Sequence, residues 1–166
     1  MSDKKKIIDL GCGTGVSTLA LGKALPQSEI YGLDFSRSEI RIAKKIKKHY
    51  DVQNVHYEIV DITELNKNKK LNRKLSSVDG VVLVALLGYI ENPLSVVEDM
   101  AKRMKKGSKI YFVEYDYRTQ LFTKPWLSNE AWIKQMFKSV GIKVTIEKKK
   151  FLFWDYICIY GIKEKT

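Results

Sequence analysis

The stretch that organises the chain is Ile7–Gly15, which reads IIDLGCGTG. A short apolar run, Ile7–Leu10, leads into three glycines at every second position, and the helix-like segment Val16–Leu25 follows. Glycine is favoured where φ must be positive, or where a side chain would keep the backbone away from a ligand. The pattern therefore predicts a buried strand, a tight glycine turn and a helix that begins over the turn, as in nucleotide-binding folds.

Two details separate this turn from the dinucleotide-binding fingerprint. That fingerprint places its third glycine after two intervening residues, where this chain has Val16, whereas here the glycine comes one position early, at Gly15. In addition, Asp9 stands two residues before the first glycine, and a carboxylate there repels a pyrophosphate but suits a ligand carrying an ammonium and a sulfonium. The stretch resembles the first motif of class I S-adenosylmethionine-dependent methyltransferases. A nicotinamide-dependent oxidoreductase is disfavoured for the same reasons.

Composition indicates one domain, residues 1–166, long enough to bury a core. No apolar run approaches the roughly 18 residues of a membrane span, and nothing resembles a signal peptide, so we expect a cytoplasmic protein. Cys12 and Cys158 do not make a disulfide framework and are expected to be reduced, packed thiols. No metal site is expected.

The formal net charge is +11, and most of the cations are lysines. This balance favours an anionic partner such as nucleic acid, an anionic membrane surface or an acidic protein. Specific phosphate recognition relies more on arginine, so a solvated lysine-rich surface without a partner is an equally good interpretation.

The rest of the chain alternates strand-like and helix-like segments. The expected strands are residues 7–10, 29–33, 55–60, 78–84, 109–114, 143–147 and 156–162. Expected helices include one that begins at Ser36, one over Leu94–Lys106 that ends at Gly107, and one capped by Ser128. The resemblance, which extends over about Ile7–Ile162, implies an α/β fold. Its sheet would be doubly wound, mostly parallel and seven-stranded in the order 3-2-1-4-5-7-6, with the last strand antiparallel and helices on both faces.

The resemblance also implies which residues bind S-adenosylmethionine. Asp9 would hold the ammonium, with the backbone of Ala85, and the glycines would admit the methionine tail. Asp34, at the end of the second expected strand, would accept both ribose hydroxyls, and Phe35 would cover one face of the adenine. In the glycine turn, the residues expected to bind the cofactor are Gly11, Cys12, Gly13 and Gly15. The alternative for Asp34 is a carboxylate at a helix N-terminus.

Asp61 and Ile62 follow the third expected strand. The resemblance assigns the adenine amino group to Asp61 and the ring face to Ile62. The alternative is that Asp61 caps a short helix over Thr63–Leu65.

The sequence indicates the methyl acceptor less specifically than it indicates the cofactor. The chain lacks the Asn/Asp-Pro-Pro-aromatic segment of enzymes that methylate exocyclic amines, and neither cysteine is placed for attack on a pyrimidine. It most resembles small-molecule methyltransferases of the ubiquinone-biosynthesis type. Expected substrate-pocket residues are Leu87, Tyr89, Tyr117 and Trp126. Glu114 or Asp116 could serve as a general base, but no spacing selects a catalytic residue.

Only six residues precede the first expected strand, whereas the resembled enzymes carry lid helices there. Those helices are therefore expected to be missing. Later segments, or a second chain in a homo-oligomer or a complex, could then complete the lid, or the site is open. The alternative function is a non-catalytic methyltransferase-like subunit that binds nucleic acid or a partner protein.

Overall fold

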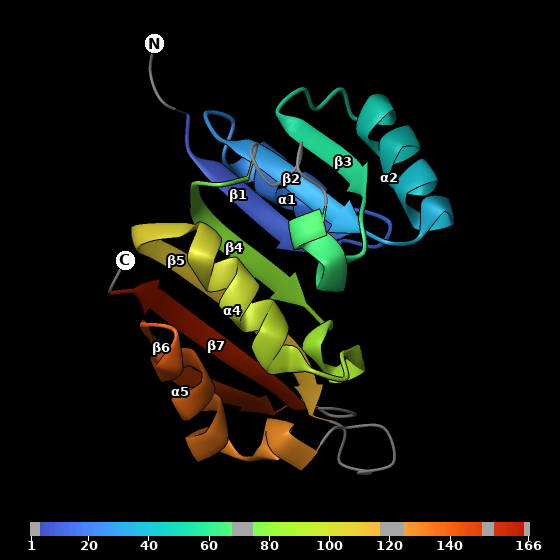
Figure 1. Ribbon diagram of the computed structural model, residues 1–166. Coiled ribbons are helices and arrows are strands. Elements are labelled where there is room, and N and C mark those ends of the chain that lie inside the picture. The colour runs from blue at the N-terminus through green and yellow to red at the C-terminus, as the bar shows by residue number, and fades with distance from the viewer. Residues whose placement is uncertain (1–3, 68–74, 117–124, 151–154, 165–166) are drawn as a thin grey trace.

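The computed structural model describes residues 4–67, 75–116, 125–150 and 155–164. These residues form a seven-stranded sheet in the order β3-β2-β1-β4-β5-β7-β6 (Figure 1). Strands β1 to β5 are parallel, and β7 pairs antiparallel with both β5 and β6. The bounds are β1 Lys6–Leu10, β2 Glu29–Asp34, β3 Val55–Ile59, β4 Val78–Val84, β5 Met104–Asp116, β6 Ile142–Lys150 and β7 Asp155–Lys163.

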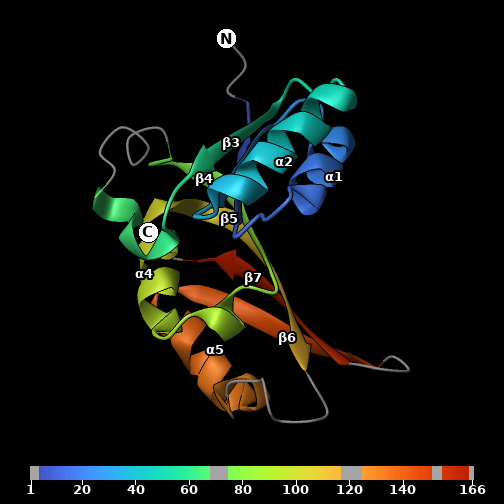
Figure 2. The same ribbon diagram turned by 90° about the vertical axis from the view of Figure 1, so that its right-hand side faces the viewer.

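Helices cover both faces of this sheet, which confirms the doubly wound fold expected from the sequence. Figure 2 shows α1 and α2 on one side of the sheet and α4 and α5 on the other. The helices are α1 Val16–Ala24, α2 Arg37–His49, α4 Pro93–Arg103 and α5 Glu130–Ser139, with short 3-10 turns η1 Ile62–Lys67, η2 Leu87–Tyr89 and η3 Pro125–Ser128. No helix among the described residues is both long and apolar enough to cross a membrane.

The two faces of the sheet bury separate apolar clusters. The larger one includes Leu83, Phe112 and Phe137 and fills the side covered by α4 and α5. The smaller one includes Ile30, Ile40 and other residues under α1 and α2. Because the sheet is covered on both faces, its central strands are almost continuously apolar.

The chain reverses its winding direction between β1 and β4, which are direct neighbours. From β1 the sheet continues to β2 and β3 on one side, and from β4 to β5 on the other. In open α/β sheets ligands bind at such a switch point, outside the carboxyl ends of the strands. The glycine turn lies directly after β1.

The segment after η2 differs from the sequence-based expectation. Helix α4 ends at Arg103 and not at Lys106, because Met104 already pairs with Val78 of β4. The register then jumps to Gly80 opposite Lys109, which leaves residues 105–108 as a bulge. Gly107 lies in this bulge with φ 81°, so its positive φ serves a strand irregularity and not a helix C-cap.

Two helix caps were also expected. Ser36 accepts a bond from the Glu39 N–H and caps α2, as its spacing predicted. By contrast, α5 is capped by Asn129, which accepts from the Trp132 N–H, and Ser128 ends the preceding turn η3. Both residue types favour N-caps, so the sequence alone could not choose between neighbouring candidates.

Candidate cofactor-binding site

The turn between β1 and α1 needs its glycines for two different reasons. Gly11, Gly13 and Gly15 all have positive φ, at 67°, 51° and 80°. A Cβ on Gly11 would lie 2.5 Å from Leu86 Cδ1, and one on Gly15 would lie 2.4 Å from Tyr57 Oη, so both are packed tightly. A Cβ on Gly13 would meet nothing closer than 3.8 Å. Gly13 therefore presents open backbone that a ligand can approach.

The turn is tied to the neighbouring strand by backbone bonds. The N–H groups of Gly11 and Cys12 both donate to the carbonyl oxygen of Leu33, at 2.8 and 3.1 Å. The Tyr57 hydroxyl donates to the carbonyl oxygen of Gly15 at 3.0 Å. The turn therefore takes its shape from β2 and β3 as well as from its own glycines.

Asp9 lies beneath this turn, with only 1% of its surface exposed. Its Oδ2 accepts bonds from Ser17 Oγ and Thr18 Oγ1, whereas Oδ1 has no partner among the described residues. Burial raises the pKa of this carboxyl; the two hydroxyl bonds lower it, and nearby Asp34 raises it again. An unpartnered buried carboxylate oxygen is costly, and a cation beside it would offset that cost. The site therefore fits a ligand that brings a positive charge.

Asp34 ends β2 and holds the glycine turn from the other side. Its Oδ2 accepts from the Gly13 N–H and its Oδ1 from the Ser36 N–H, each at 2.9 Å. The contact with Ser36, the N-cap of α2, matches the alternative prediction of a carboxylate at a helix N-terminus. The contact with Gly13 does not belong to that alternative. An ionised carboxylate has about four acceptor positions, so two bonds leave room for ligand hydroxyls.

Asp61 caps the turn η1, which was the alternative reading for this residue. Its Oδ1 accepts from both the backbone N–H and the hydroxyl of Thr63, at 2.9 and 2.6 Å. Asp61 is nevertheless exposed and lines the same pocket as Asp34, together with Ile62. The cap fixes where this carboxylate stands at the pocket wall.

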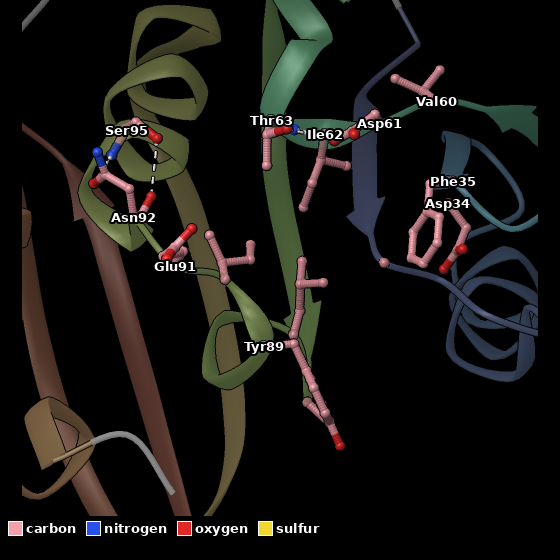
Figure 3. A pocket seen from close by; sticks show the side chains of 14 residues that line it. Asp34, Phe35, Val60, Asp61, Ile62, Thr63, Tyr89, Glu91, Asn92 and Ser95 are labelled. Atoms are coloured by element: carbon pink, nitrogen blue, oxygen red, sulfur yellow. Dashed lines mark hydrogen bonds between the residues drawn. The ribbon is translucent and has the colours of Figure 1, made fainter.

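Gly11, Asp34 and Asp61 line a pocket of about 610 Å³ at the carboxyl ends of the parallel strands. Figure 3 shows Asp34 and Phe35 on one side, Asp61–Thr63 beside them, and Tyr89 with the Glu91–Ser95 segment on the other. The pocket is lined by Gly11, Asp34, Phe35, Val60, Asp61, Ile62, Thr63, Ala85, Leu86, Tyr89, Ile90, Glu91, Asn92 and Ser95. Its size is in the usual range for a cofactor or small-ligand site.

Seven of the residues expected from the sequence line this pocket: Gly11, Asp34, Phe35, Asp61, Ile62, Ala85 and Tyr89. Asp9, Cys12, Gly13 and Gly15 are not among the lining residues, and Asp9 and Cys12 are buried. Leu87 is fully buried in the core, and Trp126 packs against Trp132 with ring centroids 5.1 Å apart. Tyr117 lies outside the described residues.

Sequence reasoning did not assign several lining residues to the site, chiefly Leu86 and Glu91. The signal that could have found them is their place directly after β4, the strand next to β1 at the switch point. Glu91 is exposed and adds a third carboxylate to the pocket wall.

Cys12 is poorly suited to covalent chemistry. Burial, with the charges of Asp9 and Asp34, raises the pKa of its thiol to about 12. A thiol that remains protonated at neutral pH is a weak nucleophile. Within the described ranges, no three His, Cys, Asp or Glu side chains are grouped so as to hold a metal ion.

The wall formed after β4 has an unusual backbone. Ala85 has a positive φ of 52°, which is uncommon for a residue with a Cβ. Its N–H donates to the Val113 carbonyl oxygen at 2.8 Å. Beyond it, Glu114 Oε1 accepts from the N–H groups of Leu86 and Leu87, at 2.6 and 2.7 Å. Glu114, considered as a general base from the sequence, is thus buried and engaged with backbone.

The fold, the glycine turn and the position of the pocket define a class I methyltransferase. A family model described as "Methyltransferase domain" matches residues 1–153, and the chain belongs to this family. The resemblance to class I S-adenosylmethionine-dependent methyltransferases is therefore confirmed.

One curated relative is similar to the chain in sequence, and two solved structures are similar to it in fold. The chain is 27% identical over 121 residues to a ubiquinone biosynthesis O-methyltransferase of Coxiella burnetii. The aligned residues make up 72% of this chain and 48% of that protein. The chain thus spans about half the length of the curated relatives it matches. The N-terminal domain of EvdMO1 with SAH bound superimposes with a TM-score of 0.74 at 19% identity, covering 98% of this chain and 76% of that one. The cyclase SpnF superimposes with a TM-score of 0.77 at 13% identity, and the superposition covers 98% of this chain and 76% of SpnF.

Proposed function

We propose that this chain transfers a methyl group from S-adenosylmethionine to a small-molecule acceptor. The observation that carries the proposal is a pocket at the switch point that Gly11, Asp34 and Asp61 line, with the buried carboxylate of Asp9 just before the glycine turn. The fold alone would not suffice, because the SpnF fold is equally similar and that protein is a cyclase.

In this proposal each residue binds one part of the cofactor. Asp9, which has an unpartnered buried oxygen, neutralises the ammonium with help from the Ala85 backbone, and Gly13 leaves space for the methionine tail. Asp34 accepts the ribose hydroxyls. Asp61 accepts the adenine amino group, while Ile62 and Phe35 lie against the ring; Phe35 is 77% exposed and free to do so.

The bound cofactor supplies an activated methyl group, and the chain's own task is to align an acceptor with it. Alignment of this kind is worth several kcal/mol without any acid or base. The wall formed by Leu86, Tyr89 and Ile90 is mostly apolar and suits an apolar or aromatic acceptor. Glu91 is the carboxylate on the acceptor side of the pocket, and it is the residue to test first if a proton must be removed.

The name of the Coxiella relative makes hydroxyl-bearing small molecules the first acceptor class to test. An acceptor screen is informative only after cofactor binding is established. Calorimetric titration with S-adenosylmethionine, its demethylated product and NADH should therefore come first.

We expect micromolar binding of the first two ligands and none of NADH. Asp34→Asn should weaken binding about tenfold or more, because a charged hydrogen-bond acceptor to the ribose is lost. The matched control is Asp51→Asn, which alters an exposed aspartate with φ 50° that Asn tolerates. Absence of binding to the wild-type protein, or binding of NADH alone, would refute the proposal.

A second candidate, binding to nucleic acid, rests on one face of α2. Arg37, Arg41, Lys44 and Lys48 follow one another at helical spacing on the outside of this helix. Within the described ranges no carboxylate forms an ion pair with any of them. With Ile40, Lys45 and exposed Ile59 they line a groove of about 370 Å³. Arg37 lies two residues from Phe35, so the basic face begins at the edge of the cofactor pocket.

Anisotropy of a labelled single-stranded RNA 20-mer, titrated at several salt concentrations, tests this candidate. Replacing Arg41, Lys44 and Lys48 by Gln should reduce the slope of log affinity against log salt by about 2. The control replaces the exposed lysines Lys143, Lys149 and Lys150 by Gln, which gives the same net charge. Equal loss in both triple variants would mean that only total charge matters and that α2 is no binding face.

A further inference from the structure

We infer that Glu114 is a positioning residue: its carboxylate holds the turn after β4 in the shape that closes the cofactor pocket. The inference rests on the function proposed above and deepens it. It assigns to Glu114 a role in cofactor binding that requires no contact with the cofactor.

Three backbone N–H groups converge on one oxygen of this side chain. Leu86 and Leu87 donate to Glu114 Oε1 at 2.6 and 2.7 Å, and Gly88 is at the long limit of 3.5 Å. Glu114 is 3% exposed, so these bonds are shielded from water. Successive N–H groups around an anionic oxygen form a strong and directional contact.

The chain reaches this arrangement through the positive φ of Ala85. The Ala85 N–H still follows the sheet, donating to Val113 of β5. The next residue turns back, so that residues 86–88 present their N–H groups to Glu114, the neighbour of Val113 on the same strand. A left-handed conformation at a non-glycine residue costs about 1–2 kcal/mol, and it persists only where surrounding contacts hold it.

The turn held in this way touches the cofactor site directly. Leu86 lines the pocket, and its side chain fills the space where a Cβ on Gly11 would be, at 2.5 Å. Ala85 and Tyr89 line the pocket on either side of it. Displacement of residues 86–88 would therefore move one wall of the pocket and the packing of the glycine turn together.

Glu114 is also sensitive to pH. Burial raises the pKa of Glu114 to about 6, although the three N–H groups lower it, and no charged side chain is among the causes of the shift. Protonation through this range removes the negative charge that the three N–H groups bind. Cofactor affinity should therefore fall as the pH drops below about 6.

The test compares wild type, Glu114→Gln, Glu114→Ala and the exposed-surface control Glu147→Gln in titrations with S-adenosylmethionine from pH 5 to pH 8. At pH 7.5 we expect affinity to fall a few-fold in Glu114→Gln and about tenfold or more in Glu114→Ala, as charged hydrogen bonds are weakened or lost. Glu114→Gln should also lose the component of the pH profile near pH 6. Asp9 and Asp34 are present in every variant, so the difference between profiles reports Glu114.

Hydrogen exchange of the amides of residues 86–88, measured without cofactor, separates this inference from the proposed function. Faster exchange in Glu114→Ala, with unchanged exchange in Glu147→Gln, is the expected result. Unchanged exchange in Glu114→Ala, or a pH profile of Glu114→Gln that overlays the wild type, would overturn the inference. If wild type binds no S-adenosylmethionine, the proposed function fails, and the exchange result still decides whether Glu114 holds the turn.

Discussion

The two walls of the pocket are built in different ways. The wall after β1 belongs to the glycine turn, of which Gly11 lines the pocket. Positive φ and tight packing exclude other residues at Gly11, against Leu86, and at Gly15, against Tyr57. The wall after β4 keeps a comparable backbone reversal at Ala85 without glycine, and relies on a buried carboxylate from another strand. The first wall is specified by residue type and the second by a long-range contact.

The two walls therefore differ in how far they depend on an ionised side chain. The packing of Gly11 against Leu86 and of Gly15 against Tyr57 involves no ionised side chain. A wall held by Glu114 depends on an ionised side chain whose burial is costly. Substitutions should therefore damage the two walls by different mechanisms.

The largest effect on the free energy of unfolding is expected when Gly15→Ala is compared with Gly107→Ala. Both glycines have nearly the same φ, 80° and 81°, but a Cβ on Gly15 meets Tyr57 whereas one on Gly107 meets nothing within 4 Å. Gly107→Ala should cost about 1–2 kcal/mol from φ strain alone. Gly15→Ala should cost about 1–3 kcal/mol more because of overpacking. Urea unfolding of both variants measures the difference, and equal losses would mean that the packing against Tyr57 is easily relieved.

A medium effect is expected for the stability of Glu114→Gln as a function of pH. Because the folded pKa of Glu114 is raised to about 6, its protonation stabilises the fold below about pH 4.5. This contribution disappears as the pH rises through 6. Relative to Glu114→Gln, wild type should therefore lose up to about 2 kcal/mol between pH 4.5 and pH 7.5. Urea unfolding at both pH values provides the check.

Such a result would sharpen the comparison, because the ionised Glu114 that holds this wall would contribute less to the stability of the fold as the pH rises. A constant stability difference across this pH range would contradict the raised pKa.

A smaller effect is expected from Tyr57→Phe on the glycine wall. The hydroxyl donates to the Gly15 carbonyl oxygen at 3.0 Å, so its removal should cost about 1 kcal/mol. Tyr50→Phe, at a residue that is 53% exposed, should leave stability unchanged. Thermal unfolding distinguishes the two, and similar melting temperatures would show that the glycine wall does not need the hydroxyl.

The smallest effect is expected from Ala85→Gly on the other wall. Glycine relieves the cost of φ 52° but loses more conformational entropy on folding, so the net gain should be below about 1 kcal/mol. A stability loss in urea unfolding would show that the Ala85 methyl group contributes packing that outweighs the strain.

Much of the fold could be read from the sequence because its signals are local. The glycine turn, the strands that lead to Asp34 and Asp61, and the Ser36 cap each depend on a few consecutive residues. The sheet order followed from the family resemblance. The end of α4 was misjudged because a glycine with positive φ marks a helix C-cap and a strand bulge equally well, and only pairing of Met104 with Val78 decides between them.

The sequence by itself thus determined the class of protein, which a motif of nine residues indicates, and it placed Asp34, Phe35, Asp61 and Ile62 after two expected strands, where they line the pocket. Only the tertiary structure decided the other wall. Leu87 is buried while its neighbour Leu86 lines the pocket, and Glu114 binds N–H groups 26 to 28 residues away. Contacts across that separation depend on how β4 and β5 pair, which no local pattern of residues specifies.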